Sequence, residues 1–370
     1  MPSERANTIQ VMKVCQAFTR LGHDVTLFAP DSGQPNPDWD SLALHYGLSS
    51  PFNIHFFHLD PIWKRRSIAW KGIHLAREIK ADLLYTRTLP PAVMGLLLNI
   101  PVILEMHQLP GGRFGPFWYR LFLRWPGRKI LVPITSALKN ALQKKYHPTL
   151  PNDQVVVAPS GVDLERFQNL PTPVIARKIL SLPEKFTVVC TGHLYPGRGM
   201  DLIFNLAERM PDVNFMWVGG TTQDVEYWRK KIEDVSIENL KLTGFIANTD
   251  LPIYQAAADV LLNPYGKIIS NSGGENTADI CSPMKVFEYM AVGRVILSSD
   301  LPVLHEVLNK SNSIFCPPEN TDAWQNALIK LKTDPAQGKK LAKQARADVE
   351  QYSWEERCRS ILAGFTKGVL

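Results

Sequence analysis

The sequence predicts an α/β protein made of two doubly wound domains, each a parallel sheet covered by helices on both faces. Short runs rich in Val, Ile and Leu alternate with longer amphipathic segments, which is typical of parallel strands connected by helices. This pattern occurs twice, and 370 residues are too many for one hydrophobic core. Between the two series, residues 160–178 contain two prolines and little periodicity, which favours a linker.

The first series contains six short apolar runs that predict strands and three amphipathic segments that predict helices. The expected strands are residues 25–29, 53–57, 82–86, 101–105, 129–133 and 154–158, and the expected helices are residues 7–21, 65–80 and 136–145. A doubly wound domain normally opens with its central strand, whereas this chain opens with a helix. Either the true start lies upstream of Met1 or the first sheet lacks that strand. The free energy lost with a central strand would exceed a typical net stability of about 5–15 kcal/mol, so we expect the start upstream of Met1.

The second series predicts four strands and six helices. The expected strands are residues 186–191, 213–218, 258–263 and 294–299, and the expected helices are residues 200–210, 225–235, 283–292, 322–332, 336–351 and 354–365. We therefore expect a first domain over residues 1–165 and a second over residues 166–350. The C-terminal helix, within residues 351–370, is expected to pack back toward the first domain.

Composition narrows the class of protein. The chain is 45% hydrophobic and 21% charged, with no apolar run of eighteen residues, so we expect a cytoplasmic protein without a spanning helix. Its five cysteines are scattered, with no CxxC pair, which favours a reducing compartment and makes a zinc site unexpected. No motif for DNA or RNA binding is present, so nucleic acid is not an expected partner.

The net charge of +6 is concentrated in the first half of the chain, where no acidic residue occurs between Glu105 and Asp153. Within this interval, residues 113–129 combine aromatic and basic side chains. The candidate contact residues are Arg113, Trp118, Arg120, Arg124, Trp125 and Arg128. Such a segment is typical of an anionic membrane surface, here the inner face of the plasma membrane. The alternative is an amphipathic helix packed on the sheet with its arginines in water.

A glycine-rich segment, residues 191–204, follows the first strand of the second series. Gly192, Gly197 and Gly199 permit close backbone approach, and the helix that follows offers free N–H groups to a phosphate. The segment departs from the P-loop pattern because Arg198 and Gly199 replace Lys and Ser/Thr, which excludes the usual magnesium ligand. Arg198 is a candidate diphosphate ligand, and the alternative is an ordinary turn with a solvated arginine.

The helix expected at residues 283–292 begins with Ser282 as N-cap and Pro283 as first residue, and it stops at Gly293. Lys285 then lies in the first turn, where the helix dipole disfavours a cation by roughly 0.3–1 kcal/mol. An anion bound there would explain this lysine. Glu288, three residues later, shares its face and could accept hydrogen bonds from a ribose diol. The alternative is an ordinary ion pair between the two.

Two further motifs bear on chemistry. His107 follows an apolar strand in a loop that ends Pro-Gly-Gly, so it is a candidate to orient a hydroxyl or stabilise a leaving phosphate; the alternative is a structural histidine. Asp38 and Asp40 spell DxD, a metal–nucleotide signature of some sugar transferases. They lie in a proline-rich loop without a preceding apolar strand, so we expect no metal there.

The order and spacing of these segments resemble the retaining glycosyltransferases of family 4. The resemblance rests on APSGVDLERF, TGHLYPGRGMDL, VNFMWVGG, LPIYQAAADVLLNPY and SPMKVFEYMAVGRVILSSDLP. It implies the GT-B fold, two Rossmann-like domains facing a central cleft, and transfer of a sugar with retention. The implied donor is a UDP- or GDP-sugar, the implied acceptor is a lipid-linked or cell-envelope glycan, and no metal or other cofactor is expected.

The resemblance also implies roles for individual residues. His107, Arg198 and Lys285 would be catalytic, with Glu288 matching the second glutamate of the family's E-x7-E motif. The remaining donor-binding candidates are Gly192, His193, Gly197, Gly199, Asp279, Ser282 and Met284. Two positions depart from the family pattern. Ile280 stands where the first glutamate is expected, so that contact with the sugar is either lost or moved to Asp279 or Glu275, and His193 stands where the family has arginine.

Two other functions are alternatives to sugar transfer. A GT-B sugar-nucleotide epimerase would need carboxylate acid/base pairs, and the first domain offers little beyond Glu105. A non-catalytic peripheral membrane adaptor would use residues 113–129 alone and would not bind a nucleotide.

Overall fold

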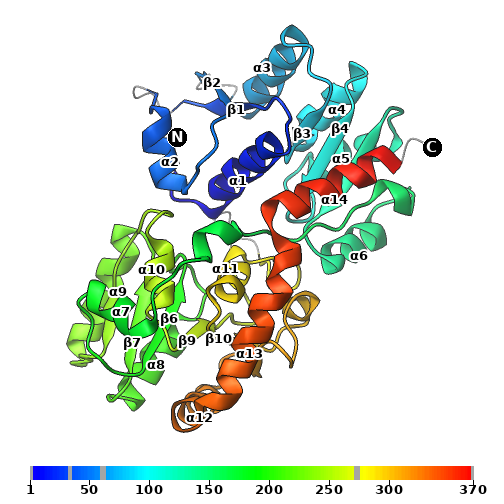
Figure 1. The fold of residues 1–370 in the computed structure, drawn as a ribbon. Helices are drawn as coiled ribbons and strands as arrows, with labels where there is room; N and C mark the ends of the chain where they lie inside the picture. The colour runs from blue at the N-terminus through cyan, green and yellow to red at the C-terminus, as the bar shows by residue number, and fades with distance from the viewer. Residues whose placement is uncertain (1–2, 32–35, 59–63, 271–275, 368–370) are drawn as a thin grey trace. The chain divides into compact units, whose positions relative to one another are not determined.

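The computed structural model of the chain describes residues 3–31, 36–58, 64–270 and 276–367. It contains two compact units, which Figure 1 colours along the chain. The first comprises Met1–Ser160, Ile280–Ser282 and Trp354–Leu370, and the second comprises Gly161–Asp279 and Pro283–Ser353. The first unit thus ends its main segment at Ser160, where the sequence analysis placed the boundary after residue 165.

The first unit contains two separate parallel sheets. Strand β1 (Thr26–Pro30) pairs with β2 (Asn53–Phe57), while β4 (Val102–Met106) lies between β3 (Leu84–Thr86) and β5 (Lys129–Pro133). Every residue of β4 and β5 is buried, as expected of strands covered on both faces. Among the described residues no strand joins the two sheets, and the expected upstream start stays a prediction.

Seven helices occur in the described part of the first unit: α1 (Ala6–Arg20), α2 (Trp39–Tyr46), α3 (Lys64–Glu78), α4 (Leu89–Leu97), α5 (Gly115–Arg124), α6 (Ser136–Lys145) and α14 (Trp354–Lys367). The C-terminal helix α14 packs against α1 and contacts β5 (Figure 1). Its Ile361 joins Ile103 and Val132 in a buried cluster, so the C-terminal segment is part of this core. No helix in the described residues is long and apolar enough to cross a membrane.

The second unit is built on one six-stranded parallel sheet with the order β11-β10-β9-β6-β7-β8. Its strands are β6 (Thr187–Thr191), β7 (Asn214–Val218), β8 (Leu240–Leu242), β9 (Val260–Asn263), β10 (Val295–Ser299) and β11 (Ile314–Cys316). Strand order reverses between β6 and β9, which is where doubly wound sheets bind ligands, beyond the carboxyl ends of the strands. The three-residue strands β8 and β11 were not predicted.

Helices cover both faces of this sheet (Figure 1). They are α7 (Pro173–Ile179), α8 (Met200–Arg209), α9 (Thr222–Asp234), α10 (Leu251–Ala256), α11 (Met284–Val292), α12 (Thr321–Thr333) and α13 (Pro335–Asp348). Successive residues of β6 enter different clusters: Val188 and Cys190 pack with α8, α9 and α12, while Val189 packs with α11. This alternation is the period-two pattern of a strand buried on both sides.

Two sequence predictions about these elements are wrong. Residues 154–158 form no regular strand: Asn152–Gln154 make a 3-10 turn, and only Val155 forms a β-bridge, with Leu131. The N–H groups of Val156 and Ala158 donate to the Leu131 and Pro133 carbonyls at 3.0 and 3.1 Å, so the run lies along β5 without a continuous ladder. Residues 160–178 are not simply a linker, because α7 begins at Pro173 with Thr172 as its N-cap. A proline at the first helical position is compatible with a helix start.

Candidate functional site

The glycine-rich loop of the second unit connects β6 to α8 at the carboxyl edge of the sheet. Gly197 and Gly199 have φ values of +79° and +95°, and a Cβ at these positions would lie 1.8 Å from the Ile268 carbonyl oxygen and 2.1 Å from that of Pro264. Both must therefore be glycine. Gly192 also has a positive φ, +128°, but a Cβ there would meet nothing within 4 Å, so the space beside it is open.

Two cationic side chains meet at the ring of Tyr265, beside this loop. The Arg198 guanidinium lies 4.8 Å from the ring centroid and donates to the Tyr265 hydroxyl, and the Lys285 ammonium lies 4.5 Å from the same centroid. Neither forms a salt bridge within the described part of the chain, and the buried Nε of Arg198 has no hydrogen-bond partner. Cations gathered without a carboxylate are expected to attract an anion.

Lys285 is only 8% exposed, and its ammonium donates to the Cys190 sulfur at 3.5 Å. Burial raises the pKa of the Cys190 thiol and outweighs the opposing effect of Lys285, so the thiol is neutral and cannot balance the lysine charge. The lysine occupies the first turn of α11, as predicted, and Gly293 ends the helix in the left-handed conformation, also as predicted.

The start of α11 differs from the prediction. Pro283, not Ser282, is the N-cap residue, and Met284 begins the helix half-buried. Ser282 instead belongs to the first unit, where its hydroxyl accepts from the Ser160 N–H at 2.9 Å and its carbonyl accepts from the Ser160 hydroxyl at 2.7 Å. Proline has no backbone N–H to donate. Because Pro283 lies just before the first helical residue, the helix loses no hydrogen bond there.

Glu288 lies one turn after Lys285 on α11, and the two do not face the same partners. The Glu288 carboxylate accepts from the Gln255 side chain at 2.8 Å, whereas Lys285 faces Cys190 and Tyr265. Gln255 is fully buried and was not singled out in the sequence. It orients the carboxylate that was expected to bind a ribose.

The other donor-binding candidates have different surroundings. The His193 ring stacks on Tyr195 with centroids 4.9 Å apart. Asp279 is exposed to solvent. Ile280 packs against the core of the first unit, and its carbonyl accepts from Thr135 at 3.1 Å. Glu275 lies outside the described residues.

The first unit contains a second polar cluster, around the end of β4. The His107 Nε2 is hydrogen-bonded to Glu105, which is 1% exposed and also accepts from the Gln10 amide at 3.1 Å. Since a carboxylate only accepts, Nε2 carries the proton and Nδ1 is left as the acceptor of the neutral ring. On β3 and α14, Tyr85 and Arg357 hold the other Glu105 oxygen, with Arg357 Nη2 at 2.7 Å.

The charges of this cluster settle its protonation. Burial alone would raise the pKa of Glu105, but Arg357, His107 and Arg87 together hold it well below its usual range, so the carboxylate is ionised. Burial, reinforced by Arg87, lowers the pKa of His107 to about 4 despite the opposing Glu105 charge. His107 is therefore neutral at physiological pH and presents Nδ1 as a hydrogen-bond acceptor.

Sequence reasoning singled out His107 but missed the residues that orient it. Arg357 is separated from Glu105 by 252 positions, and Gln10 by 95, so no local pattern links them. An unusual signal was present, because Glu105 is a charged residue inside an apolar strand. Such a residue needs a buried partner of opposite charge.

The aromatic basic segment is divided between core and surface. Helix α5 buries Tyr119, Phe122 and Leu123, and the half-buried Trp118 and Trp125 pack against the same core. The exposed aromatic residues of this segment are Phe114 and Phe117, whose side chains are 57% and 59% exposed. Neither was among the predicted membrane-contact residues. The exposed arginines are Arg113, Arg120, Arg124 and Arg128, and of these Arg128 is held over the Phe365 ring at 4.1 Å.

The DxD motif has a structural role. Asp38 is the N-cap of α2 and accepts from the Ser41 N–H at 2.7 Å, which lowers its pKa. Among the described residues, no group of three or more His, Cys, Asp and Glu side chains could hold a metal ion.

Two family models match the chain, one on each half. The model of Glycosyltransferase Family 4 matches residues 8–166, and the model of Glycosyl transferases group 1 matches residues 185–334. The ranges fall largely on the first and second units, respectively.

Curated relatives match over part of their length. The alpha-galactosylglucosyldiacylglycerol synthase of Streptococcus pneumoniae is 25% identical over 215 residues, 56% of this chain and 53% of the relative. The GDP-mannose-dependent alpha-(1-6)-phosphatidylinositol monomannoside mannosyltransferase of Mycobacterium tuberculosis is 33% identical over 146 residues, 37% of this chain and 36% of the relative. The chain thus spans about half of the first relative and about a third of the second.

Solved structures share the fold at low identity. Anabaena HepE, solved in complex with UDP, has a TM-score of 0.70 at 17% identity, covering 92% of this chain and 99% of its own. Sucrose-phosphate synthase from Thermosynechococcus elongatus has a TM-score of 0.77 at 16% identity, covering 98% and 93%. With a family model on each half of the chain and the GT-B fold shared with these structures, the chain belongs to the family 4, group 1 glycosyltransferases.

Proposed function

We propose that this chain transfers a sugar from a nucleotide-diphospho-sugar to an acceptor hydroxyl, with retention of configuration. The observation that carries the proposal is the pair of cations, Arg198 and Lys285, that meet at the Tyr265 ring without a carboxylate partner among the described residues. They lie at the glycine loop, at the switch point of the sheet where doubly wound folds bind ligands, and the space beside Gly192 is open. HepE, solved with UDP, supports a uridine nucleotide, while the mycobacterial relative's name supports a guanosine one.

The charges suggest how the bond is broken. Cleavage of a sugar–phosphate bond leaves negative charge on the diphosphate, which Arg198, Lys285 and the N–H groups at the start of α8 would stabilise by several kcal/mol. These groups can take the place of a metal, so we expect no metal requirement. Glu288, oriented by Gln255, would accept hydrogen bonds from the ribose hydroxyls.

His107 is proposed to hold the transferred sugar. Its neutral ring, held by Glu105, offers Nδ1 to a sugar hydroxyl. Glu105 itself is ill suited to proton transfer, because Arg357 and Tyr85 occupy it and its pKa is far below neutrality. An epimerase would need such a carboxylate to exchange protons, so transfer is the better supported reaction.

Thermal shift with nucleotides tests the donor site. We expect UDP or GDP to raise the melting temperature of the wild type, and Arg198→Ala or Lys285→Ala to abolish the shift. Arg229→Ala, an exposed arginine on α9, is the matched control and should keep it. A wild type that no nucleoside diphosphate stabilises would contradict the proposal and leave the non-catalytic adaptor as the better hypothesis.

The acceptor is proposed to be membrane-bound, with Phe114, Phe117 and the neighbouring arginines resting on an anionic bilayer. Two exposed aromatic rings beside basic side chains have the chemistry of an interfacial contact. Each charge near the surface contributes about 1 kcal/mol, so neutralising Arg113, Arg120 and Arg124 to Gln should weaken vesicle binding about 100-fold or more.

Vesicle co-sedimentation with phosphatidylglycerol measures this effect. A triple variant of exposed cations elsewhere in the same unit, Arg5, Arg77 and Lys80 to Gln, is the control and should bind nearly as wild type. If the wild type ignores anionic vesicles while nucleotide binding persists, a soluble glycan acceptor is favoured and the membrane proposal fails.

A further inference from the structure

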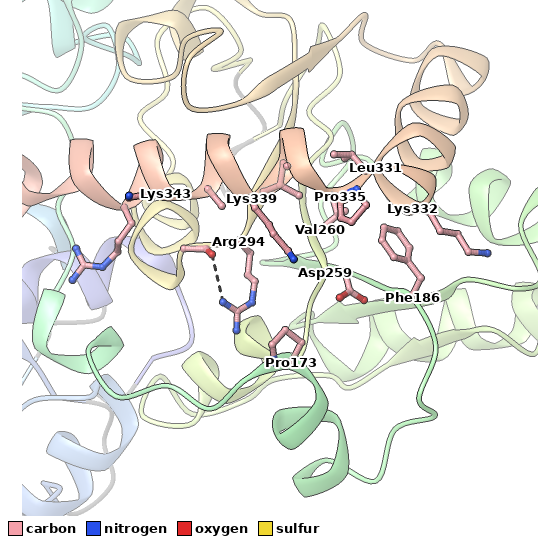
Figure 2. A pocket seen from close by; sticks show the side chains of 15 residues that line it. Pro173, Phe186, Asp259, Val260, Arg294, Leu331, Lys332, Pro335, Lys339 and Lys343 are labelled. Carbon is pink, nitrogen blue, oxygen red and sulfur yellow. Dashed lines mark hydrogen bonds between the residues drawn. The ribbon is translucent and has the colours of Figure 1, made fainter.

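The second unit contains a cavity of about 660 Å³ at the amino ends of β6, β9 and β10. Its walls include Phe186 and Val260 at the starts of strands, Pro173 of α7, and residues of α12 and α13 (Figure 2). The residues proposed to bind the nucleotide follow β6 at its carboxyl end. The cavity therefore opens at the opposite edge of the same parallel sheet. Its volume lies within the range of about 300–1,000 Å³ that is usual for small-molecule sites.

The charge of the lining is strongly positive. Five cationic side chains line the cavity with a single carboxylate: Arg294, Lys332, Lys339, Lys343 and Arg346, together with Asp259. The Asp259 carboxylate is already balanced, because it accepts from the Arg177 guanidinium at 2.9 Å and from the Thr187 N–H at 2.8 Å.

Two of the five cations have carboxylate partners outside the lining, since Lys332 pairs with Asp212 and Arg346 with Glu350. Within the described residues, no salt bridge involves the remaining three, which are Arg294, Lys339 and Lys343. The cavity is thus left with three cations that have no carboxylate partner in the described part of the chain: Lys339 and Lys343, which are exposed, and Arg294, which is half-buried.

Arg294 is the only one of these three groups that is not exposed. Its guanidinium makes long hydrogen bonds to four carbonyls, at 3.2 Å to Ala256, 3.3 Å to Pro171 and 3.4 Å to both Val292 and Gly293, and its buried Nε has no partner among the described residues. Burial lowers the pKa of Arg294, which reflects the energetic penalty of holding this charge away from water. An anion in the cavity would relieve that penalty.

Helix α13 presents the other cations to the same space. Lys339, Lys343 and Arg346 are four and three residues apart and so lie on one face, and Figure 2 shows Lys339 extending from the helix toward Arg294 and Asp259. Gly338 lets α13 approach α12 closely, because a Cβ there would lie 3.1 Å from the Leu331 side chain. Three of the five cations of the lining therefore come from a helix that packs closely on its neighbour.

The remaining lining is apolar, and includes Phe186, Val260, Leu331 and Pro335. A bare inorganic anion would leave these side chains facing water, and a purely apolar ligand would leave the cations unbalanced. We propose that this cavity binds a small amphipathic anion, whose carboxylate or phosphate lies between Arg294 and Lys339 and whose apolar body packs on Phe186 and Leu331. The site is separate from the nucleotide site and lies beyond the proposed transferase activity.

Fluorescence titration of the full chain with 8-anilinonaphthalene-1-sulfonate, an aromatic anion, tests this site. Decanoate should displace the dye, whereas decanol and inorganic phosphate at the same concentration should not. Lys339→Glu/Lys343→Glu should weaken dye binding tenfold or more. The control Lys330→Glu/Lys340→Glu reverses two exposed lysines on the same helices that do not line the cavity, and should change it less than twofold.

Several outcomes would overturn the inference. Equal displacement by decanol and decanoate would make charge irrelevant, and equal displacement by phosphate would make the apolar body irrelevant. Equal weakening in both charge-reversal variants would place the dye elsewhere. A saturating nucleoside diphosphate should leave dye affinity unchanged, and competition between them would mean that the dye occupies the nucleotide site. Circular dichroism melts of each variant confirm that it is folded.

Discussion

Replacing Arg357 with Met should destabilise the first unit more than any surface substitution on α14. Arg357 is 5% exposed and its guanidinium lies 2.7 Å from the Glu105 carboxylate, which is itself 1% exposed. Removing one partner of a buried ion pair leaves an uncompensated charge, at about 3–5 kcal/mol. Arg357 also donates to the Pro159 carbonyl at 2.7 Å and to that of Ala158 at 3.2 Å, so the upper part of this range is expected.

The magnitude translates into a measurable melting shift. For a unit of about 180 residues, each kcal/mol changes the melting temperature by about 2–4 °C, so a loss of about 4–5 kcal/mol lowers it by about 8–20 °C. Circular dichroism or calorimetry measures it. Arg359→Met is the matched control on the same helix, because Arg359 is exposed and pairs only with the exposed Glu356. An exposed pair of this kind contributes at most about 1 kcal/mol.

The double variant provides a second test of the buried ion pair. Glu105→Gln combined with Arg357→Met removes both charges, so much of the lost stability should return. The reasoning is refuted if Arg357→Met melts within about 2 °C of Arg359→Met, or if adding Glu105→Gln lowers the melting temperature further. Either result would mean that the buried carboxylate does not depend on Arg357.

Three other predictions concern the two candidate sites. NMR titration should find His107 neutral down to about pH 5, since its pKa is lowered to about 4. The unfolded chain takes up this proton near pH 6.5. The stability that the neutral His107 ring contributes should therefore be lost as the pH falls from 6.5 toward 4. Gly197→Ala should abolish the nucleotide-induced melting shift, because its Cβ would lie 1.8 Å from a carbonyl oxygen. Gly22→Ala is the control: with φ +88° and open space around it, it should lower the melting temperature only through backbone strain and should keep the nucleotide-induced shift. Lys285→Met should leave the unliganded protein as stable as wild type or more so, because an unbalanced buried cation is removed; a melting temperature several degrees lower would show that the lysine charge is satisfied internally.

Much of the fold could be predicted because its signals are local. Residues 129–133 and 136–145 were predicted with the bounds that the structure shows, since an apolar run and an amphipathic period are read from adjacent residues. Elements whose local signal was weak were missed, among them α4, whose second and third residues are prolines, and the strands β8 and β11. The N-cap of α11 was misplaced by one residue, within the ordinary uncertainty of helix ends.

By itself, the sequence determined the two-part α/β organisation, the glycine loop with Arg198, and a lysine in the first turn of α11. Each depends on neighbours within a few positions, where periodicity and backbone conformation are set. Only the tertiary structure decided that Arg198 and Lys285 both lie over the Tyr265 ring, and that Arg357 stabilises the ionised Glu105 carboxylate, which orients His107. These contacts join residues far apart in the chain, and their energies depend on burial, which exists only once the sheets and helices have packed.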